Sequence, residues 1–338
     1  MDVVSDAIAA VRAGRPASNR LRVAGRWGAR IPSYAGAGFH VVLSGSCWLL
    51  ADGGGPLRLG PGDAVLLPHG SGHALSDGEL TAARAARLPE LDSLLGPRRR
   101  PGSGPDAAGA DASGADAAGA GTTGAGAPGA GAPDPGAPGA ADLLCGKYRL
   151  DHGLGHPLMR ELPQVVHLPT RTGEHPELRA AVDLLSSELT AARPGGELAV
   201  PGLIDLLLVY LVRAWTTRRG ADGWGAALTD PVVATALAAV HEDPAHPWTT
   251  ETLATHAGVS RATLTRRFTT LTGRPPMAYL TWWRMTRAAG LLRNTVDPLE
   301  AVARRVGYAS PYALSHAFVR QFGTTPGRYR AARTALVA

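Results

Sequence analysis

Cysteine is nearly absent from this chain of 338 residues, which contains only Cys47 and Cys145. Two cysteines cannot staple a small secreted scaffold, and no CxxC spacing is present to hold a structural zinc ion. Both lie in runs predicted as strands, where a free cysteine usually behaves as a small buried apolar residue. The cysteine content therefore favours a reducing cytoplasm.

Long hydrophobic runs are also lacking. The longest candidate, Leu203 to Val212, is shorter than the ~20 residues of a membrane span and is interrupted by Asp205. The first residues, Met1 to Asp6, carry acidic groups where a secretory signal carries basic ones. No catalytic triad, P-loop or dinucleotide-binding glycine motif appears. We therefore expect no membrane partner, no export, no cofactor and no enzyme activity.

The charge that is present is distributed unevenly. Residues 229–338 contain thirteen Arg and no Lys against three Asp and three Glu, a net charge of +7. The rest of the chain carries 21 basic and 22 acidic groups and is close to neutral. A basic domain beside a neutral one is typical of nucleic-acid-binding proteins, although a basic surface that only aids solubility would have the same composition.

A low-complexity segment divides the first half of the chain. Residues 101–140 contain only Pro, Gly, Ser, Asp, Ala and Thr. Without large apolar side chains such a segment cannot offset the entropy lost on ordering. We predict a disordered insertion over residues 97–141, and the parts on either side of it, residues 1–96 and 142–170, are expected to form one sensor domain.

Short apolar runs on both sides of the insertion predict that this domain is rich in β-strands. Glycine-rich turns separate most of them. The runs are Phe39–Leu43, Cys47–Leu50, Ala64–Leu67, Leu143–Leu150 and Gln164–Leu168.

From Pro176 onward, apolar residues recur every three or four positions, which predicts two amphipathic helices. We assign residues 171–226 to a helical linker or dimerisation segment. Its stretch Leu203–Trp215 is apolar around most of a helix and is expected to pack between domains or between two subunits.

The C-terminal part, residues 229–334, contains two similar helical patterns. In the first, Thr249 can cap a helix, Gly258 supplies a tight turn, and Ser260 can cap a second helix that extends to Thr270. Small and apolar residues occupy the spacing of a helix-turn-helix at Leu253, Ala254, Ala257, Val259 and Leu264. The polar and basic face of the second helix is suited to a DNA major groove.

The same pattern recurs 49 residues later, where Gly307 takes the place of Gly258. Asp297 is expected to cap the first helix of this second unit, and its second helix is predicted from Ser310 to Gln321. A helix over residues 276–292 joins the two units. Two reading helices on one rigid body would enter successive major grooves, about 34 Å apart on one face of the DNA.

Several motifs here closely resemble the AraC/XylS family of transcriptional regulators. They are Gly273-x-Pro275-x-x-x-Tyr279-Leu280 with Arg284-Met285, then Ala303-x-x-Val306-Gly307-Tyr308, and Phe318-x-x-Gln321-Phe322-Gly323-x-x-Pro326-x-x-Tyr329-Arg330. The resemblance covers about 100 residues and implies a seven-helix domain bound to promoter DNA. It also implies that DNA bases are contacted by Thr265, Arg266, Tyr312 and His316.

Other polar residues of the two units are expected to contact the DNA backbone, which positions a protein without reading sequence. These residues are Arg261, Arg267, Ser310 and Arg320. A phosphate contact is also the alternative for Arg266, while Trp282 and Trp283 are expected to pack inside the domain.

The sensor part resembles the cupin barrels. Their second motif has the spacing found here for Gly62, Pro68, His69, Gly70, His73 and Asp77. The first cupin motif, which would supply a His pair and a Glu before Gly45, is missing, so we assign no metal site. Imidazole suits several transition metals, so a different site remains an alternative to ordinary hydrogen-bonded histidines. The possible sensor residues are His40, Cys47, His69, His73 and Cys145.

Together these features predict a multidomain α+β protein: a cupin-like β-barrel, a disordered insertion, a helical dimerisation segment and an all-α double helix-turn-helix domain. We expect a cytoplasmic, homodimeric, sequence-specific transcription regulator. Its expected partners are double-stranded promoter DNA, a small-molecule or stress effector, and RNA polymerase. The alternatives are a cupin metal-dependent enzyme with an accessory helical domain and a non-specific architectural DNA-binding protein.

Overall fold

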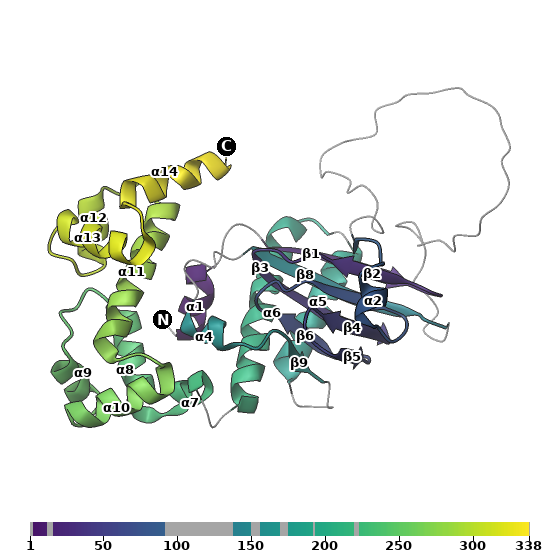
Figure 1. Cartoon of the computed structure of the whole chain (residues 1–338), viewed down its shortest axis with the longest axis horizontal. Helices are drawn as coiled ribbons and strands as arrows, with labels where there is room; N and C mark the ends of the chain where they lie inside the picture. Colours follow the sequence, from purple (N-terminus) through teal and green to yellow (C-terminus); the bar gives the residue numbers. More distant parts are fainter. Residues whose placement is uncertain are drawn as a thin grey trace.

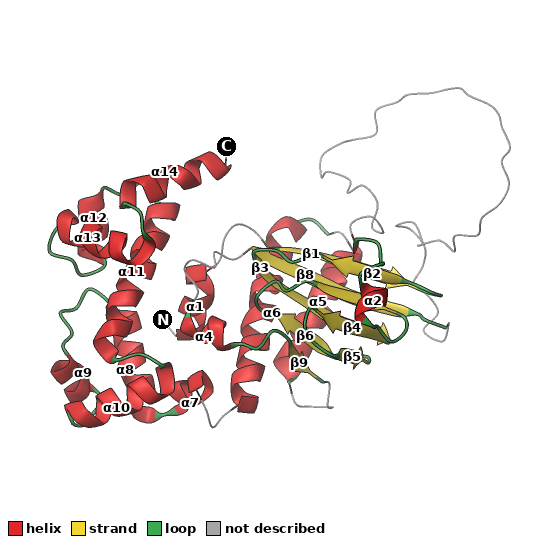
Figure 2. Ribbon diagram, in the orientation of Figure 1, coloured by secondary structure: helices red, strands yellow, loops and turns green. Residues whose placement is uncertain are grey.

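The computed structural model describes residues 3–11, 16–91, 138–149, 156–169, 175–191, 193–219 and 223–337 (Figures 1 and 2). The insertion predicted to be disordered, residues 97–141, lies mostly outside these ranges. All the described strands lie in the first half of the chain and helices predominate in the second half, which confirms the α+β class.

Two antiparallel sheets pack against each other in the N-terminal domain. The five-stranded sheet has the order β1-β8-β3-β6-β9, and the four-stranded sheet has the order β2-β7-β4-β5. β8 pairs with both β1 and β3, so strands from before and after the insertion lie in one sheet. The strands are β1 (Ala17–Val23), β2 (Gly28–Ile31), β3 (Gly36–Gly45), β4 (Cys47–Ala51), β5 (Pro56–Leu59), β6 (Ala64–Leu67), β7 (His73–Ser76), β8 (Ala141–Arg149) and β9 (Val166–Leu168).

The five-stranded sheet is buried on both faces, which explains the continuous apolar run in β3. Successive side chains of a strand point to opposite faces of the sheet. Phe39 and Val41 belong to a cluster that includes the helices behind the sheet, whereas Val42 packs with Leu49 and Leu75 of the four-stranded sheet. A strand covered on both sides has no polar face, so it lacks the alternation of a half-exposed strand.

Six helices described before residue 230 cover the sheets and join them to the rest of the chain. They are α1 (Val3–Val11), α2 (Ala82–Ala85), α4 (Pro157–Glu161), α5 (Pro176–Ala191), α6 (Gly196–Arg219) and α7 (Gly223–Thr229). α6 contacts β1 and β9 as well as α1 and α7, so it packs between the five-stranded sheet and two helices that precede the C-terminal part. The interdomain or intersubunit role expected for residues 203–215 stays a prediction.

By length and composition α6 could cross a membrane, since the mean hydropathy of its most apolar stretch is 1.7. α7 and the helix that follows it, Pro231–Glu242, meet the same criteria when they are taken together as one bent span. The core helix of a soluble protein meets these criteria too. Ile204, Leu207, Leu208 and Leu211 of α6 are fully buried against the protein. Packing within the chain therefore accounts for part of the apolar character of α6, while Leu198 and Leu206 on the same helix are 84% and 38% exposed.

α1 was not predicted from the sequence. Its residues Val3, Val4, Ala7 and Ile8 are buried and recur at helical spacing, a pattern that would have predicted the helix. α1 contacts α4, α6, α8 and α11, and Figure 1 shows it between the barrel and the C-terminal helices. α1 therefore packs against the part that resembles a DNA-binding domain.

Seven helices form the described C-terminal part, the number that the family resemblance implies. They are α8 (Pro231–Glu242), α9 (Thr250–His256), α10 (Arg261–Thr272), α11 (Pro276–Asn294), α12 (Leu299–Arg305), α13 (Pro311–Phe322) and α14 (Pro326–Val337).

The start of α12 corrects one prediction. The N-cap residue is Pro298, without a side-chain cap hydrogen bond, so the expectation that Asp297 caps this helix is wrong. The Asp297 carboxylate instead accepts a hydrogen bond from Arg305 at 2.8 Å, and the Asp297 carbonyl accepts one from Arg330 at 2.6 Å. The Asp297 carboxylate is therefore engaged by Arg305 and does not cap the helix.

Two cores divide the C-terminal part, and α11 belongs to both. Tyr279 and Trp283, in the first half of α11, pack in a cluster that continues through α7, α8, α9 and α10 into the helix-covered face of the barrel. Ala288 and Leu292, in its second half, pack with α12 and α13 in a separate cluster. The first helix-turn-helix unit therefore shares a core with the sensor part, whereas the second has its own.

Candidate nucleic-acid interface

The first helix-turn-helix unit consists of α9 and α10. Thr249 caps α9 in a capping box with Thr252, and Ser260 caps α10 by accepting a hydrogen bond from the Thr263 amide at 3.2 Å. Gly258 between the helices has a φ of +70°, a conformation that glycine adopts without steric cost. The predicted helix starts and turn of this unit are confirmed.

The second unit, α12 and α13, repeats this construction. Gly307 has a φ of +78°, and Ser310 caps α13 by accepting a hydrogen bond from the Ala313 amide at 3.2 Å. The Tyr308 amide donates to the Ala303 carbonyl at 2.9 Å, as the Val259 amide donates to Ala254 in the first unit. Both units therefore have the same turn, and the repeat predicted from sequence is confirmed in three dimensions.

Arg284 of α11 connects the two units. Its guanidinium donates hydrogen bonds to the carbonyl groups of Pro244 at 2.7 Å and His246 at 2.8 Å, in the loop before α9. The same group lies 6.0 Å from the ring centre of Tyr308 in the second unit. A Cβ atom on Gly307 would lie 2.8 Å from the backbone of Ala245, so the two units also approach each other closely at this point.

These contacts make the two units one body with α11 as its axis (Figure 1). Sequence reasoning did not assign this role to Arg284, although the residue stands in one of the family-like motifs.

The residues expected to contact DNA bases lie on the outer faces of α10 and α13. Arg266 and His316 are exposed, and Tyr312 is 81% exposed. Thr265 is half-buried, and its hydroxyl donates to the Arg261 carbonyl at 2.9 Å within the helix. Three of the four side chains are thus fully presented to solvent.

The residues expected to contact the DNA backbone have more varied surroundings. Arg261 and Arg320 are exposed, while the half-buried Ser310 hydroxyl is the cap of α13. Arg267 forms an ion pair at 3.4 Å with Asp230, the residue that caps α8. This pair draws the Arg267 guanidinium toward α8 and away from its neighbour Arg266. Trp282 and Trp283 are buried, as expected of packing residues.

In the barrel, the structure brings together three of the five possible sensor residues. His40 on β3 and His73 on β7 face each other across the two sheets, with their Nε2 atoms 2.8 Å apart, and the Cys145 Sγ lies 3.1 Å from the His40 Nδ1. The His73 Nδ1 donates to the Ser71 carbonyl at 2.9 Å. One set of neutral tautomers satisfies this chain: Cys145 donates to His40, and His40 donates to His73.

Burial keeps all of these groups uncharged. It lowers the pKa of His40 well below its usual range, with a further contribution from His73, and it lowers the pKa of His73 as well. Burial, with Asp63 nearby, raises the pKa of Cys47 to about 12, and it also raises the pKa of Cys145. Both thiols are free and buried, as expected from the sequence, and they lack the thiolate character of reactive cysteines.

His69 does not join this group, because its Nε2 donates to the Leu162 carbonyl at 2.7 Å. Within the residues that the structure describes, no group of three His, Cys, Asp or Glu side chains is arranged to hold a metal ion. The alternative site made of His40, His69 and His73 is therefore not assembled in this fold.

Comparison with known proteins matches both halves of the chain. A family model for cupin domains covers residues 2–217, and a model described as a helix-turn-helix domain covers residues 253–332. A putative AraC-like transcription regulator of Streptomyces antibioticus is 32% identical over 98% of this chain and 98% of its own length. A putative AraC-like transcription regulator of Streptomyces lividans has the same identity and coverage.

The chain belongs to the AraC-like transcription regulators. It is a DNA-binding transcription regulator with a cupin domain in its N-terminal part. The crystal structure of the DNA-binding domain of AdpA in complex with a target DNA is similar to the C-terminal part, with 40% identity over 31% of this chain and 95% of that chain and a TM-score of 0.30.

This AraC-like regulator has a buried polar network where its cupin part contacts its DNA-binding part, and sequence reasoning missed it. The His241 Nδ1 of α8 lies 2.9 Å from the Asp6 carboxylate of α1, and the His241 Nε2 lies 2.7 Å from the Tyr279 hydroxyl of α11. The Tyr279 hydroxyl is also 3.0 Å from the Nε2 of His156, which precedes α4. Each of the four side chains is at most 3% exposed.

One assignment of protons satisfies the whole network. The Leu158 amide donates to the His156 Nδ1, so a neutral His156 carries its proton on Nε2 and donates to Tyr279. Tyr279 can then donate to His241, which donates to Asp6. Because Asp6 and His241 are 235 residues apart, no local sequence pattern could have paired them.

The buried histidines predict that the folded protein loses stability in mild acid. Burial, together with His241 and Arg274, lowers the pKa of His156 well below its usual range, as burial does for His40. Below about pH 6.5 the unfolded chain binds protons at these histidines and the folded chain does not, so unfolding becomes easier as the pH falls. The stabilisation is complete above that pH.

We expect each of these two histidines to contribute a loss of up to about 1.4 kcal/mol per pH unit below pH 6.5. Urea unfolding between pH 8 and pH 5 measures the slope. In the double variant His40→Gln, His156→Gln, the free energy of unfolding should fall less steeply between pH 8 and pH 5 than in the unchanged protein, with each protein compared with its own value at pH 8. An unchanged slope in that variant would contradict the assignment.

Proposed function

We propose that this protein is a sequence-specific transcription regulator that binds promoter DNA with both helix-turn-helix units at once. The observation that carries the proposal is the single body formed by α9 to α13, in which Arg284 of α11 contacts both the loop that leads into α9 and Tyr308 of the second unit. A body with two reading helices at a fixed separation favours DNA that presents its sites at the matching separation. Two tethered but independent units would not impose such a spacing.

Within this body we assign base contacts to Arg266 and Thr265 of α10 and to Tyr312 and His316 of α13. An exposed Arg is suited to a bidentate contact with guanine in the major groove. Backbone contacts are assigned to Arg261, Arg267, Ser310 and Arg320, which lie at the ends or flanks of the same helices.

The remaining partners belong to the N-terminal part. Apolar side chains are exposed on neighbouring helices there: Leu184 on α5 and Leu198 and Leu206 on α6 are 56%, 84% and 38% exposed. Exposed apolar side chains on adjoining elements support a homodimer contact. We further propose that the protein acts in the cytoplasm on RNA polymerase and responds to a small-molecule or stress signal. We also propose that it has no catalytic activity, which the naming of its relatives as transcription regulators supports.

The experiment that tests the proposal maps the genomic DNA bound by the full chain and then measures affinity for a mapped site against random DNA at fixed salt. A regulator of this kind should prefer its site by roughly 10³-fold or more. Equal affinities for both DNAs would leave only the non-specific architectural alternative.

Arg320→Ala should weaken binding to the mapped site and to random DNA by the same factor. It should also reduce the slope of log affinity against log salt by about 1, because one phosphate contact is lost. Fluorescence anisotropy over a salt series measures both quantities. Arg58→Ala, which removes an exposed charge from β5 of the barrel, is the matched control and should change neither. A loss confined to the mapped site would show that Arg320 contacts a base.

A further inference from the structure

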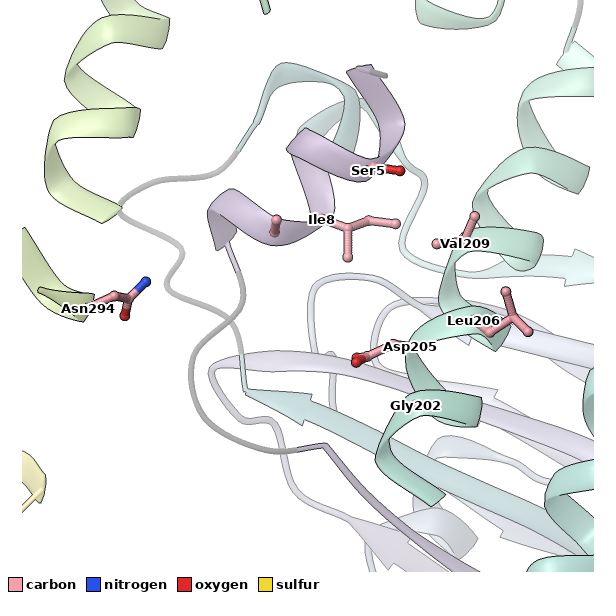
Figure 3. A pocket seen from close by; sticks show the side chains of 8 residues that line it. Ser5, Ile8, Gly202, Asp205, Leu206, Val209 and Asn294 are labelled. Atoms are coloured by element: carbon pink, nitrogen blue, oxygen red, sulfur yellow. The ribbon is translucent and has the colours of Figure 1, made fainter. Parts of the chain in front are cut away.

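The two helix-turn-helix units have separate apolar cores, which are connected through α11. Tyr279 and Trp283 place the first half of α11 in the core that continues into the sensor part, whereas Ala288 and Leu292 place its second half in the other core. At the end of α11, Asn294 lies across a pocket of about 660 Å³ from α1 and α6 (Figure 3). The second unit is therefore oriented mainly through α11 and through its contacts with the first unit.

Another connection between the units lies beside α11, where the loop of residues 243–248 meets the turn at Gly307. A Cβ atom on Gly307 would lie 2.8 Å from the Cα atom and 2.9 Å from the carbonyl oxygen of Ala245. It would also lie 2.9 Å from the Arg284 guanidinium, which donates hydrogen bonds to two carbonyl groups of the same loop. Only a residue without a side chain allows so close an approach. We call residues 243–248, Arg284 and Gly307 the joint.

The loop is held firmly on its side of the joint. The Asp243 carboxylate accepts hydrogen bonds from the amides of Ala245 and His246, both at 3.0 Å. The Trp248 indole donates to the Asp243 carbonyl at 3.0 Å, and Asp243 is also the C-cap residue of α8. The loop therefore gives the second unit a fixed surface to pack against.

We propose that this joint sets the base-pair spacing that the regulator accepts between the two DNA segments it reads, with Arg284 and Gly307 as positioning residues. The inference rests on the proposed function, because spacing matters only if both units bind DNA at once. One added base pair moves the second segment by about 3.4 Å along the DNA and about 35° around it. A fixed joint cannot follow that movement, and deforming the DNA to compensate costs free energy.

Arginine is suited to the joint because its planar guanidinium donates in several directions at once. The Arg284 Nε donates to the Pro244 carbonyl at 2.7 Å and its Nη2 donates to the His246 carbonyl at 2.8 Å, while the same group lies 6.0 Å from the Tyr308 ring centre. Lysine carries the same charge as a compact ammonium group without this fork. Arg284→Lys therefore keeps the charge and loosens the joint.

The repeat within the chain supplies a matched control for Gly307. Gly258 occupies the equivalent turn of the first unit with a φ of +70°, compared with +78° at Gly307. A Cβ atom on Gly258 meets nothing within 4 Å. Gly258→Ala and Gly307→Ala therefore impose similar backbone strain, and only Gly307→Ala also forces the second unit away from the loop.

The test measures the affinity of the full chain for the mapped site and for versions with one base pair inserted or removed between the two segments. Single-base variants of the site locate the segments, and fluorescence anisotropy at fixed salt measures affinity. We expect the unchanged protein to prefer the native spacing by at least roughly tenfold, because a displaced reading helix loses its base contacts.

Arg284→Lys and Gly307→Ala should each reduce the preference for native spacing to less than about threefold. Gly258→Ala and Arg287→Lys should leave it unchanged, since Arg287 is also on α11 but lies over the Trp283 ring of the first core. A variant that is only less stable loses affinity by the same factor at every spacing and keeps the preference.

A spacing preference that survives both Arg284→Lys and Gly307→Ala overturns the proposal. An equal reduction in Gly258→Ala or Arg287→Lys also overturns it. Arg284→Lys decides the matter alone if Gly307→Ala does not fold.

The two levels of inference can fail separately. A chain that prefers the mapped site at its native spacing, with or without the joint variants, retains the proposed function and loses only the joint. A chain that prefers the mapped site at any spacing loses both the joint and simultaneous binding by the two units. A chain without any preference for mapped DNA over random DNA loses the proposed function itself.

Discussion

Asp6→Ala is expected to lower the free energy of unfolding by about 1 to 3 kcal/mol, the cost of leaving the buried N–H of His241 without its acceptor. Asp6 is 3% exposed and His241 is 1% exposed, so water cannot replace the lost contact of 2.9 Å between the Asp6 carboxylate and the His241 Nδ1. The substitution also removes the contact by which α1 holds α8. Urea unfolding of the full chain at pH 7.5 measures the change.

Asp183→Ala is the matched control. Asp183 pairs with Arg179 at 3.4 Å on α5, and both side chains are about two-thirds exposed, at 65% and 66%. An exposed pair of this kind contributes at most about 1 kcal/mol, so its loss should be small. If the two Asp→Ala variants lose equal stability, the network between the cupin part and the DNA-binding part does not join them tightly.

Arg266→Ala is expected to weaken binding to the mapped site by about 1 to 3 kcal/mol, the range for loss of a good base contact, and to relax base preference at one position. The loss on random DNA should be smaller, because a base contact contributes little there. Competition binding against a set of single-base variants of the site measures both effects.

Arg267→Ala is the control for this prediction. It removes the same charge from the next residue of α10, whose side chain is paired with Asp230. It should weaken mapped and random DNA alike. Equal losses on both DNAs from Arg266→Ala would show that Arg266 contacts a phosphate, the alternative considered for it from the sequence.

Much of the DNA-binding part was predictable because its signals are local. Ser260 and Ser310 cap helices within three residues, and Gly258 and Gly307 form turns whose backbone conformation favours glycine. Five strands of the barrel, β3, β4, β6, β8 and β9, were predictable for the same reason, since each is a local apolar run. The strands β1, β2, β5 and β7 were not predicted from the sequence. Asp297 was the exception, because its carboxylate forms an ion pair with Arg305, eight residues away.

The site residues divide in the same manner. Exposure of Arg266, Tyr312 and His316 follows from helical periodicity once Leu264 and Leu314 are placed inside. The roles of Arg284 and Arg267 do not follow from it, because each depends on an acceptor about 40 residues distant in the chain. The grouping of His40 with His73 and Cys145, and the separation of His69 from them, depended on which strands pair across the barrel.

By itself, the sequence determined that this protein has a basic double helix-turn-helix domain after a β-rich, cupin-like part. Charge, helix caps, turns and hydrophobic periodicity depend on residues that are close in the sequence. They are therefore the same however the segment packs against the rest of the protein. Only the tertiary structure decided that α1 lies between the two parts, that Asp6 meets His241, and that a pocket forms beside them. Those features depend on surfaces that meet only when segments from opposite ends of the chain pack together.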